Sequence, residues 1–184
     1  WTDTETVFLP PALDIGSRAA ATSCYMAMAT LLWAQGRYGT FNVDLEAALS
    51  GVRDRAIALA WLALLEAVRL TARLQRDLPG LRTGLEALTG NLPPELDAAR
   101  PILAAPEATV SDSLAWLNAR PALLEQMPPP CPLLGELRPE AAQRVRAARI
   151  RQQAEVLRLS VAELVAALRE EQGVREVEVA SDAE

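Results

Sequence analysis

An acidic and a basic residue follow directly after the most apolar stretch of the chain. Residues 56–65 carry no charge, and Glu66 and Arg69 then follow three positions apart. Residues at this spacing lie on one face of a helix, and Arg73 lies one turn further along the same face. Because an isolated buried charge is costly, these groups must find partners if they are buried. We therefore expect Glu66, Arg69 and Arg73 to form a structural ion-pair network rather than an active site.

Groups that could carry catalysis are otherwise scarce. The chain has no histidine, which removes the usual general base, the Ser–His triad and every imidazole metal site. Cys24 lies among Ala, Met and Tyr in a helix-like run, which is typical of a buried core cysteine. The carboxylate pairs Asp3 with Glu5 and Glu170 with Glu171 lie in strand-like or exposed helical contexts, not in a cleft. We expect no enzyme activity, no catalytic or metal-binding residue and no cofactor.

Composition narrows the class of protein further. With 184 residues, 51% of them hydrophobic, the chain is long enough to bury a sizeable core. The net charge of -6 argues against nucleic-acid binding, which needs clustered positive charge. The two distant cysteines make no disulfide framework and no signal-peptide pattern opens the chain, so a cytoplasmic location is expected. The uncharged run 19–36 contains several polar residues, which favours a buried helix over a membrane span.

The elements that would position these residues are mostly helical. Cap residues and apolar periodicity predict helices over 17–35, 42–50 and 52–78, the first two capped by Ser17 and Asn42. The third helix is apolar on nearly all sides in its middle, so other elements should surround it. The expected fold class is mainly α: a compact multi-helix domain with a long central helix.

Shorter elements complete the expected domain. Shorter helices are expected over 81–88, 94–103 and 113–120. Alternating polar and apolar residues near 4–9 and 174–179 predict one or two short strands, which could pair with each other.

Prolines divide the chain into three parts. Residues 1–127 form the expected globular domain with its N-terminal strand, and the Pro-rich segment 128–138 is an extended connector. Residues 139–184 form a long helix, a short strand and an acidic tail, which we expect to pack on the same domain.

The C-terminal helix carries two patterns that could serve a partner. Its apolar positions are spaced like a coiled-coil seam, although over fewer heptads than a stable coiled coil usually needs; they are Ile150, Ala154, Leu157, Val161, Leu164 and Leu168. A helix laid back on its own domain is the alternative explanation. An arginine cluster could contact an acidic partner or could be only a solvated face; it comprises Arg144, Arg146, Arg149 and Arg151.

Four blocks of the sequence resemble one known family. In order, they are WTDTETVFLPPAL, MAMATLLWAQGRYGTF, LLEAVRLTARLQRDLPGLR and MPPPCPLLGELRPE. Their order and spacing, over roughly residues 1–140, are similar to the N-terminal regions of the CbbO and NorD proteins. Those bacterial proteins carry a C-terminal von Willebrand factor A domain and work with MoxR-type AAA+ ATPases.

The resemblance implies an adaptor without catalysis of its own. A CbbO-type adaptor docks on a CbbQ-like MoxR-type AAA+ ATPase hexamer and couples it to rubisco, the client, through its A domain. A NorD-type adaptor would instead serve the maturation of nitric oxide reductase. The chain departs from the family in lacking the D-x-S-x-S metal motif of the A domain, because Ser111-Asp112-Ser113 does not match it. Relatives also tend to carry a further acid after Glu66, where this chain has Ala67 and Val68.

Two other classes of function stay open from the residues alone. Glu66 with neighbouring carboxylates could be the remnant of a metal-dependent hydrolase, which metal analysis of the purified protein would reveal. Alternatively, the seam between 150 and 168 could make the protein a dimerising helical scaffold. Sedimentation at several concentrations would then show a dimer.

Overall fold

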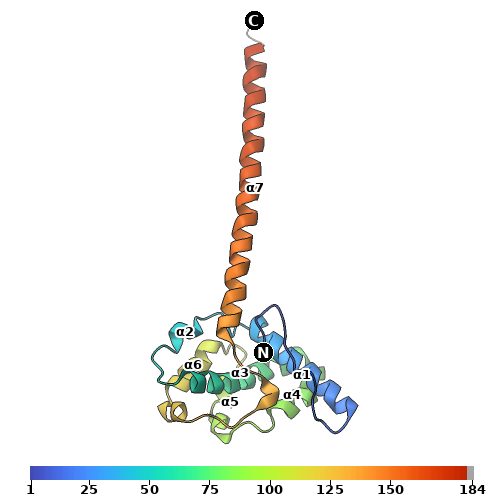
Figure 1. Cartoon of the computed structure of the whole chain (residues 1–184), viewed down its shortest axis with the longest axis vertical. Coiled ribbons are helices and arrows are strands. Elements are labelled where there is room, and N and C mark those ends of the chain that lie inside the picture. The colour runs from blue at the N-terminus through green and yellow to red at the C-terminus, as the bar shows by residue number, and fades with distance from the viewer. Residues whose placement is uncertain (182–184) are drawn as a thin grey trace. The chain divides into compact units, whose positions relative to one another are not determined.

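The computed structural model describes the backbone of residues 1–181 and the side chains of residues 1–168 other than Pro132. It falls into two units, Trp1–Gln143 and a second that begins at Arg144. The described residues form seven α-helices joined by loops and 3-10 turns (Figure 1): α1 Arg18–Arg37, α2 Leu45–Ala48, α3 Arg55–Asp77, α4 Arg82–Thr89, α5 Arg100–Leu103, α6 Val110–Asn118 and α7 Pro139–Ser181. The mainly α fold class is therefore confirmed.

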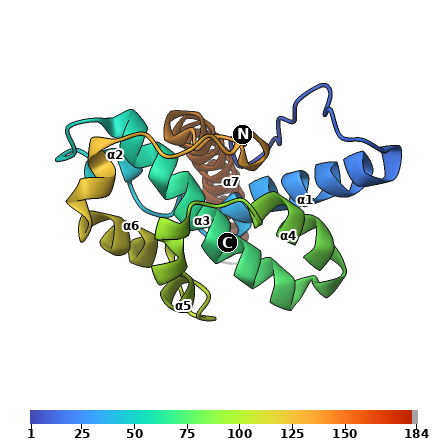
Figure 2. The ribbon, with the colours of Figure 1, turned by 90° about the horizontal axis from the view of Figure 1, so that it is seen from below.

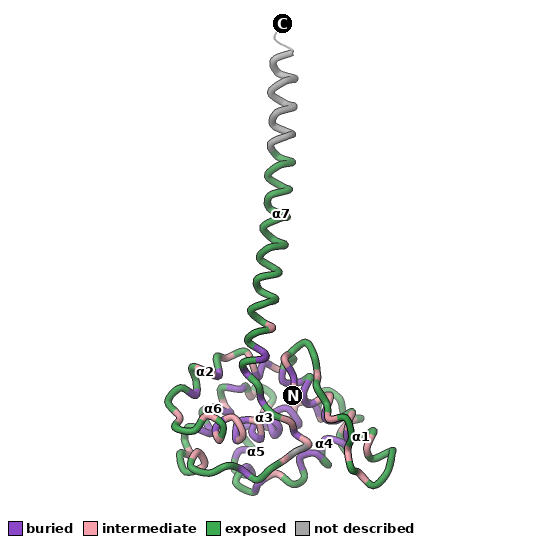
Figure 3. Tube along the Cα trace, viewed as in Figure 1, coloured by how far each residue is buried: buried purple, intermediate pink, exposed green. Residues whose placement is uncertain are grey.

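Helix α3 is the centre of the first unit. It contacts α1, α4, α5 and α6, which surround it when the unit is viewed along another axis (Figure 2). Its leucines Leu62, Leu65, Leu70 and Leu74 are completely buried. Burying one such side chain stabilises a fold by about 1.5–3 kcal/mol, so α3 contributes a large share of the core. Figure 3 shows this buried centre in purple.

Helix α1 packs closely on α4 because of one glycine. Ser17 begins α1 as its N-cap, with its hydroxyl accepting from the Ala20 amide at 3.2 Å. On the facing helix, a Cβ added to Gly84 would lie 3.1 Å from the Ala27 Cβ and 3.2 Å from the Ser23 carbonyl oxygen. The two helices therefore approach at a distance that only glycine allows without displacement.

The N-terminal segment is a tight turn rather than a strand. A single antiparallel bridge joins Thr2 to Val7, and the Trp1 and Phe8 rings stack at 3.9 Å. The Asp3 carboxylate accepts from the amides of residues 5 and 6 at 3.0 and 2.7 Å. These side-chain bonds satisfy backbone donors that a strand would have paired with a neighbour. The predicted strand near 4–9 is therefore wrong.

The second predicted strand is also wrong. Residues 174–179 belong to α7, whose backbone is helical through Ser181. Glu and Arg are good helix formers, and extending an existing helix costs no new nucleation. Gly173 lies inside this helix, where a glycine costs about 1 kcal/mol relative to alanine.

The proline-rich segment 128–138 belongs to the first unit. Leu134 and Leu137 after the prolines are buried in the core, and the Trp61 indole on α3 donates to the Gln126 carbonyl at 3.0 Å. Gly135 has a φ of 75°, which glycine adopts without strain. The segment therefore packs on the helical domain, and the division between units falls after Gln143.

Two helices begin at different residues from those expected. Asp44, not Asn42, caps α2, and its carboxylate accepts from the Ala47 amide at 3.1 Å. Helix α6 begins at Val110 rather than at the expected residue 113, and Thr109 before it forms a capping box with Asp112. A carboxylate also interacts favourably with the positive end of the helix dipole, which explains the choice of these acids.

Candidate functional site

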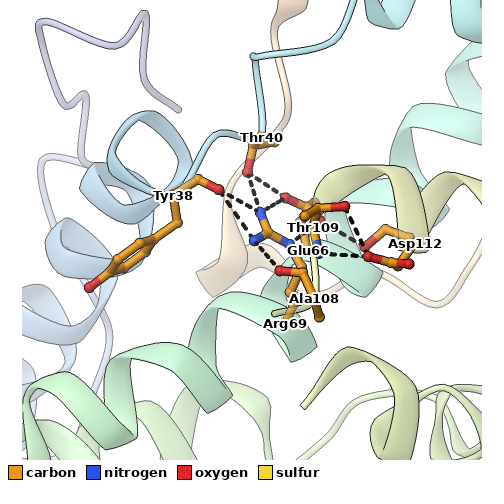
Figure 4. A network of polar contacts seen from close by, with 8 residues as sticks. Tyr38, Thr40, Glu66, Arg69, Ala108, Thr109 and Asp112 are labelled. Carbon is orange, nitrogen blue, oxygen red and sulfur yellow. Dashed lines mark hydrogen bonds and ion pairs between the residues drawn. The ribbon is translucent and has the colours of Figure 1, made fainter. Parts of the chain in front are cut away.

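The most elaborate polar structure of the first unit is a buried cluster around Glu66 and Arg69 (Figure 4). Both residues lie on the central helix α3, one turn apart. The cluster also takes groups from the end of α1, from the loop at Thr40 and from the start of α6, where Ser113 lies. Glu66 is completely buried and Arg69 is 4% exposed.

Both carboxylate oxygens of Glu66 are fully engaged. Oε1 accepts from Arg69 Nε and from the Ser113 hydroxyl, each at 2.8 Å. Oε2 accepts from Arg69 Nη2 at 2.5 Å and from the Thr40 hydroxyl. The guanidinium therefore meets the carboxylate side-on through two parallel bonds, the strongest geometry for this pair.

Arg69 also binds backbone from two other elements. Its Nη1 and Nη2 donate to the Tyr38 carbonyl at 3.3 and 3.2 Å, and Nη1 donates to the Ala108 carbonyl at 3.4 Å. Tyr38 ends α1 and Ala108 lies just before α6. A carbonyl at a helix end has no partner within the helix, so Arg69 satisfies a group that would otherwise be orphaned. The cluster ties α1, α3 and α6 together.

Arg73 lies outside this cluster, contrary to the expected three-residue network. Its Nη1 donates to the Pro106 carbonyl at 2.6 Å, and its Nε lies 3.5 Å from the Asp77 carboxylate. Its guanidinium also lies over the Tyr38 ring, 5.3 Å from the centroid. The side chain is 41% exposed, whereas the neighbouring Leu74 on the same turn is completely buried. Arg73 therefore binds the loop before α6 at the protein surface, outside the buried cluster.

A surface hollow of about 410 Å³ adjoins the cluster. Among its charged lining residues, Arg73 lies beside Asp77 and Arg76 donates to the Ala104 carbonyl at 2.7 Å. The Tyr38 hydroxyl donates to Asp77 at 2.6 Å. This bond is the main reason that the pKa of Asp77 lies below its ordinary value, while burial raises the pKa of Tyr38. Arginines outnumber acids along the lining, with Arg37, Arg69, Arg73 and Arg76 against Asp77 and Glu107.

The capping box of α6 positions Ser113 for Glu66. The Asp112 carboxylate accepts from the Thr109 amide at 2.8 Å and from the Thr109 hydroxyl at 2.9 Å. The backbone bond, followed by the hydroxyl bond, lowers the pKa of Asp112. Fixing this first turn directs the next residue, Ser113, toward the cluster.

Asp112→Ala is expected to destabilise the protein by about 1 kcal/mol at neutral pH, because it removes a helix cap at the surface. Since the folded-state pKa is depressed, the contribution of Asp112 is complete above the unfolded value near about 4 and disappears as the pH falls through the folded value. Urea unfolding of both proteins at several pH values measures this difference. Ser111→Ala, in the same turn, is the matched control and should change little; equal effects at both positions would contradict the capping account.

The two thiols are poor nucleophiles. Burial raises the pKa of Cys24 and of Cys131, so both stay protonated to a higher pH than usual.

Where side chains are described, no three His, Cys, Asp or Glu residues come together in a way that could hold a metal ion. Among the described residues, no helix carries an apolar stretch long enough to cross a bilayer.

The arginines named from the sequence belong to a different unit from Glu66. Arg144, Arg146, Arg149 and Arg151 all lie on α7 in the second unit. Of these, Arg151 donates from Nε to the Ala147 carbonyl of its own helix at 3.3 Å. The four side chains therefore form a basic stretch of one helix.

Sequence reasoning missed Thr40 and Ser113, two of the three residues that bind Glu66. They lie 26 and 47 positions from it, and no local pattern links such distant residues. A signal did exist for Ser113, because a serine in the first turn of a capped helix can direct its hydroxyl toward the protein interior.

No family model matches the sequence, and neither the curated proteins nor the solved structures include a match to this chain.

Proposed function

We propose that this chain is a non-catalytic adaptor domain that docks on a MoxR-type AAA+ ATPase hexamer of the CbbQ-like kind. In this proposal the adaptor couples the hexamer to rubisco through a von Willebrand factor A domain. The observation that carries the proposal is the buried Glu66–Arg69 cluster, which joins three elements and leaves neither oxygen of Glu66 for a substrate. The four resembling sequence blocks supply the class of partner.

A rigid body suits a part that transmits force between a motor and its client. The Arg69 guanidinium donates both to the Tyr38 carbonyl at the end of α1 and to the Ala108 carbonyl in the loop before α6. Displacing either element from α3 would break charge-assisted hydrogen bonds in a water-excluded place, where they are strongest. The first unit therefore should move as one piece when the ATPase pulls on it.

The first unit exposes apolar side chains suited to docking. Phe8 and Leu9 on the N-terminal segment, and Met26 and Trp33 on α1, are each 38–53% exposed. The segment is tied to α1, because Tyr25 donates its hydroxyl to the Pro10 carbonyl at 2.9 Å. Aromatic residues and Met are enriched at interfaces. The net charge of -6 would also speed association with a basic surface.

Trp33→Glu is expected to weaken binding to the ATPase at least about tenfold, the cost of removing one interface anchor residue. The comparison is a pull-down of the wild type and the variant with a purified CbbQ-type hexamer, with and without nucleotide. Ile102→Glu is the control, since Ile102 is equally apolar and 50% exposed but lies on α5. A Trp33 variant that binds like the wild type would exclude this face of α1 as the docking surface.

The alternative is a NorD-type adaptor for nitric oxide reductase maturation. The two adaptors differ in their ATPase partner, so the same pull-down with the MoxR-type hexamer that works with NorD separates them. Preference for the CbbQ-type hexamer supports the rubisco assignment. Residues 1–184 contain no D-x-S-x-S motif, so without an added A domain they are not expected to activate rubisco.

A further inference from the structure

Helix α7 carries an apolar seam within the second unit. Its members repeat with heptad spacing: Ala154, Val161 and Leu168 at position a, and Ile150, Leu157 and Leu164 at position d. All of these except the small Ala154 are large side chains with 50–65% of their surface exposed. A β-branched residue at a with leucine at d, as in Val161 with Leu157, favours a two-stranded packing.

Within residues 144–181, the second unit has no further element that could cover this seam. From Arg144 to Ser181 it is a single helix. The seam from Ile150 to Leu168 extends over roughly 28 Å at the rise of an α-helix. Exposed apolar strips of this length mark interaction sites in soluble proteins.

The charges beside the seam indicate what can cover it. Positions e and g border the seam of a coiled coil and select its partner. Here position e holds Arg144, Arg151, Arg158 and the apolar Val165, and position g holds Arg146 followed by the neutral Gln153, Ser160 and Ala167, with no acid at either position between 144 and 168. The acids of this stretch, Glu155 and Glu163, fall at positions b and c, which face away from the seam.

This pattern disfavours a second copy of the chain. In a parallel pair, position g of one helix meets position e of the next heptad in the other, which places Arg146 opposite Arg151. In an antiparallel pair, e meets e and g meets g, so arginine meets arginine or a neutral residue. Neither arrangement offers any e or g arginine a carboxylate.

We propose that the α7 seam binds one helix of another protein that has an apolar a/d face flanked by Glu or Asp at its e and g positions. Such a helix would cover the leucines and place carboxylates against Arg151 and Arg158. Opposite charges here select the partner and its register, and a basic partner would be rejected by repulsion. This surface is independent of the α1 face proposed for docking.

The test uses the full chain and two synthetic helical peptides of three heptads. Both peptides carry Val at a and Leu at d; one has Glu at every e and g position and the other has Lys. Fluorescence anisotropy measures binding of each labelled peptide at low and high salt. We expect the Glu peptide to bind at least about tenfold more tightly than the Lys peptide, with a preference that shrinks as salt increases.

Matched variants locate the binding to the seam. Arg151→Glu combined with Arg158→Glu should reverse the preference toward the Lys peptide, whereas Arg149→Glu at position c should not. Leu157→Gln should abolish binding, whereas Leu159→Gln at position f, equally exposed on the same helix, should not. Circular dichroism of each variant verifies that the helix content is retained.

Three results would overturn the proposal. They are failure of the Glu peptide to bind, equal binding of the two peptides, and a dimer of the chain alone in sedimentation velocity that Leu157→Gln dissociates. The last result would assign the seam to self-association. Loss of ATPase docking with intact peptide binding would reject the proposed function while leaving this inference standing.

Discussion

Glu66→Ala is expected to lower the free energy of unfolding by about 3–5 kcal/mol, the usual cost of breaking a buried ion pair on one side. The substitution leaves the Arg69 guanidinium, only 4% exposed, without its counter-ion. It also removes the acceptor of the Thr40 and Ser113 hydroxyls. Urea or thermal unfolding followed by circular dichroism measures the loss.

Two further variants make this result specific to the buried pair. Asp97→Ala breaks the exposed pair with Arg100, whose side chains are 68% and 47% exposed, and should cost about 0–1 kcal/mol. Glu66→Leu combined with Arg69→Met should be less destabilising than Glu66→Ala, since no charge is left buried. A Glu66→Ala protein that melts like the wild type would show that the pair does not hold the fold together.

Gly84→Val is expected to destabilise the protein by about 1–3 kcal/mol, the typical cost of overpacking a close helix contact. Even the Cβ atom would lie 3.1 Å from both the Ala27 Cβ and the Ser23 hydroxyl. Because the Ser23 carbonyl is also within 3.2 Å, backbone must move and α1 must separate from α4. Chemical denaturation of the purified variant gives the magnitude.

Gly80→Val is the matched control for this packing. A Cβ at Gly80 meets nothing within 4 Å, so the same change in volume should cost about 0.5 kcal/mol or less. Equal losses at the two glycines would mean that an intrinsic effect of valine, and not the contact between α1 and α4, controls the result.

The long helices were predictable because their signals are local. Ser17 before an uncharged run marked the start of α1, and the unbroken apolar stretch before Glu66 identified α3 as the central helix. Glu66 and Arg69 could be paired from spacing alone, since three residues along a helix bring side chains together. Their burial in the structure follows from the position of α3 among four other helices.

The parts that were not predictable depend on distant residues. Alternation near 4–9 resembled a strand, but a strand needs a partner along its length, and the segment folds back on itself after one bridge at Thr2 and Val7. The same alternation of polar and apolar residues at 174–179 lies within α7, which begins at Pro139. Thr40 and Ser113 reach Glu66 only because the chain returns to α3 twice, which no local pattern records.

Sedimentation velocity of the chain with a CbbQ-type AAA+ hexamer tests the central claim most directly. The chain is labelled and titrated with unlabelled hexamer in the absence of nucleotide, with ADP and with a non-hydrolysed ATP analogue. The account predicts that the label moves with the hexamer in at least one nucleotide state and is displaced by excess unlabelled chain. A label that sediments as the free chain in every state, with the fold verified by circular dichroism, would contradict the assignment as an adaptor for this class of ATPase.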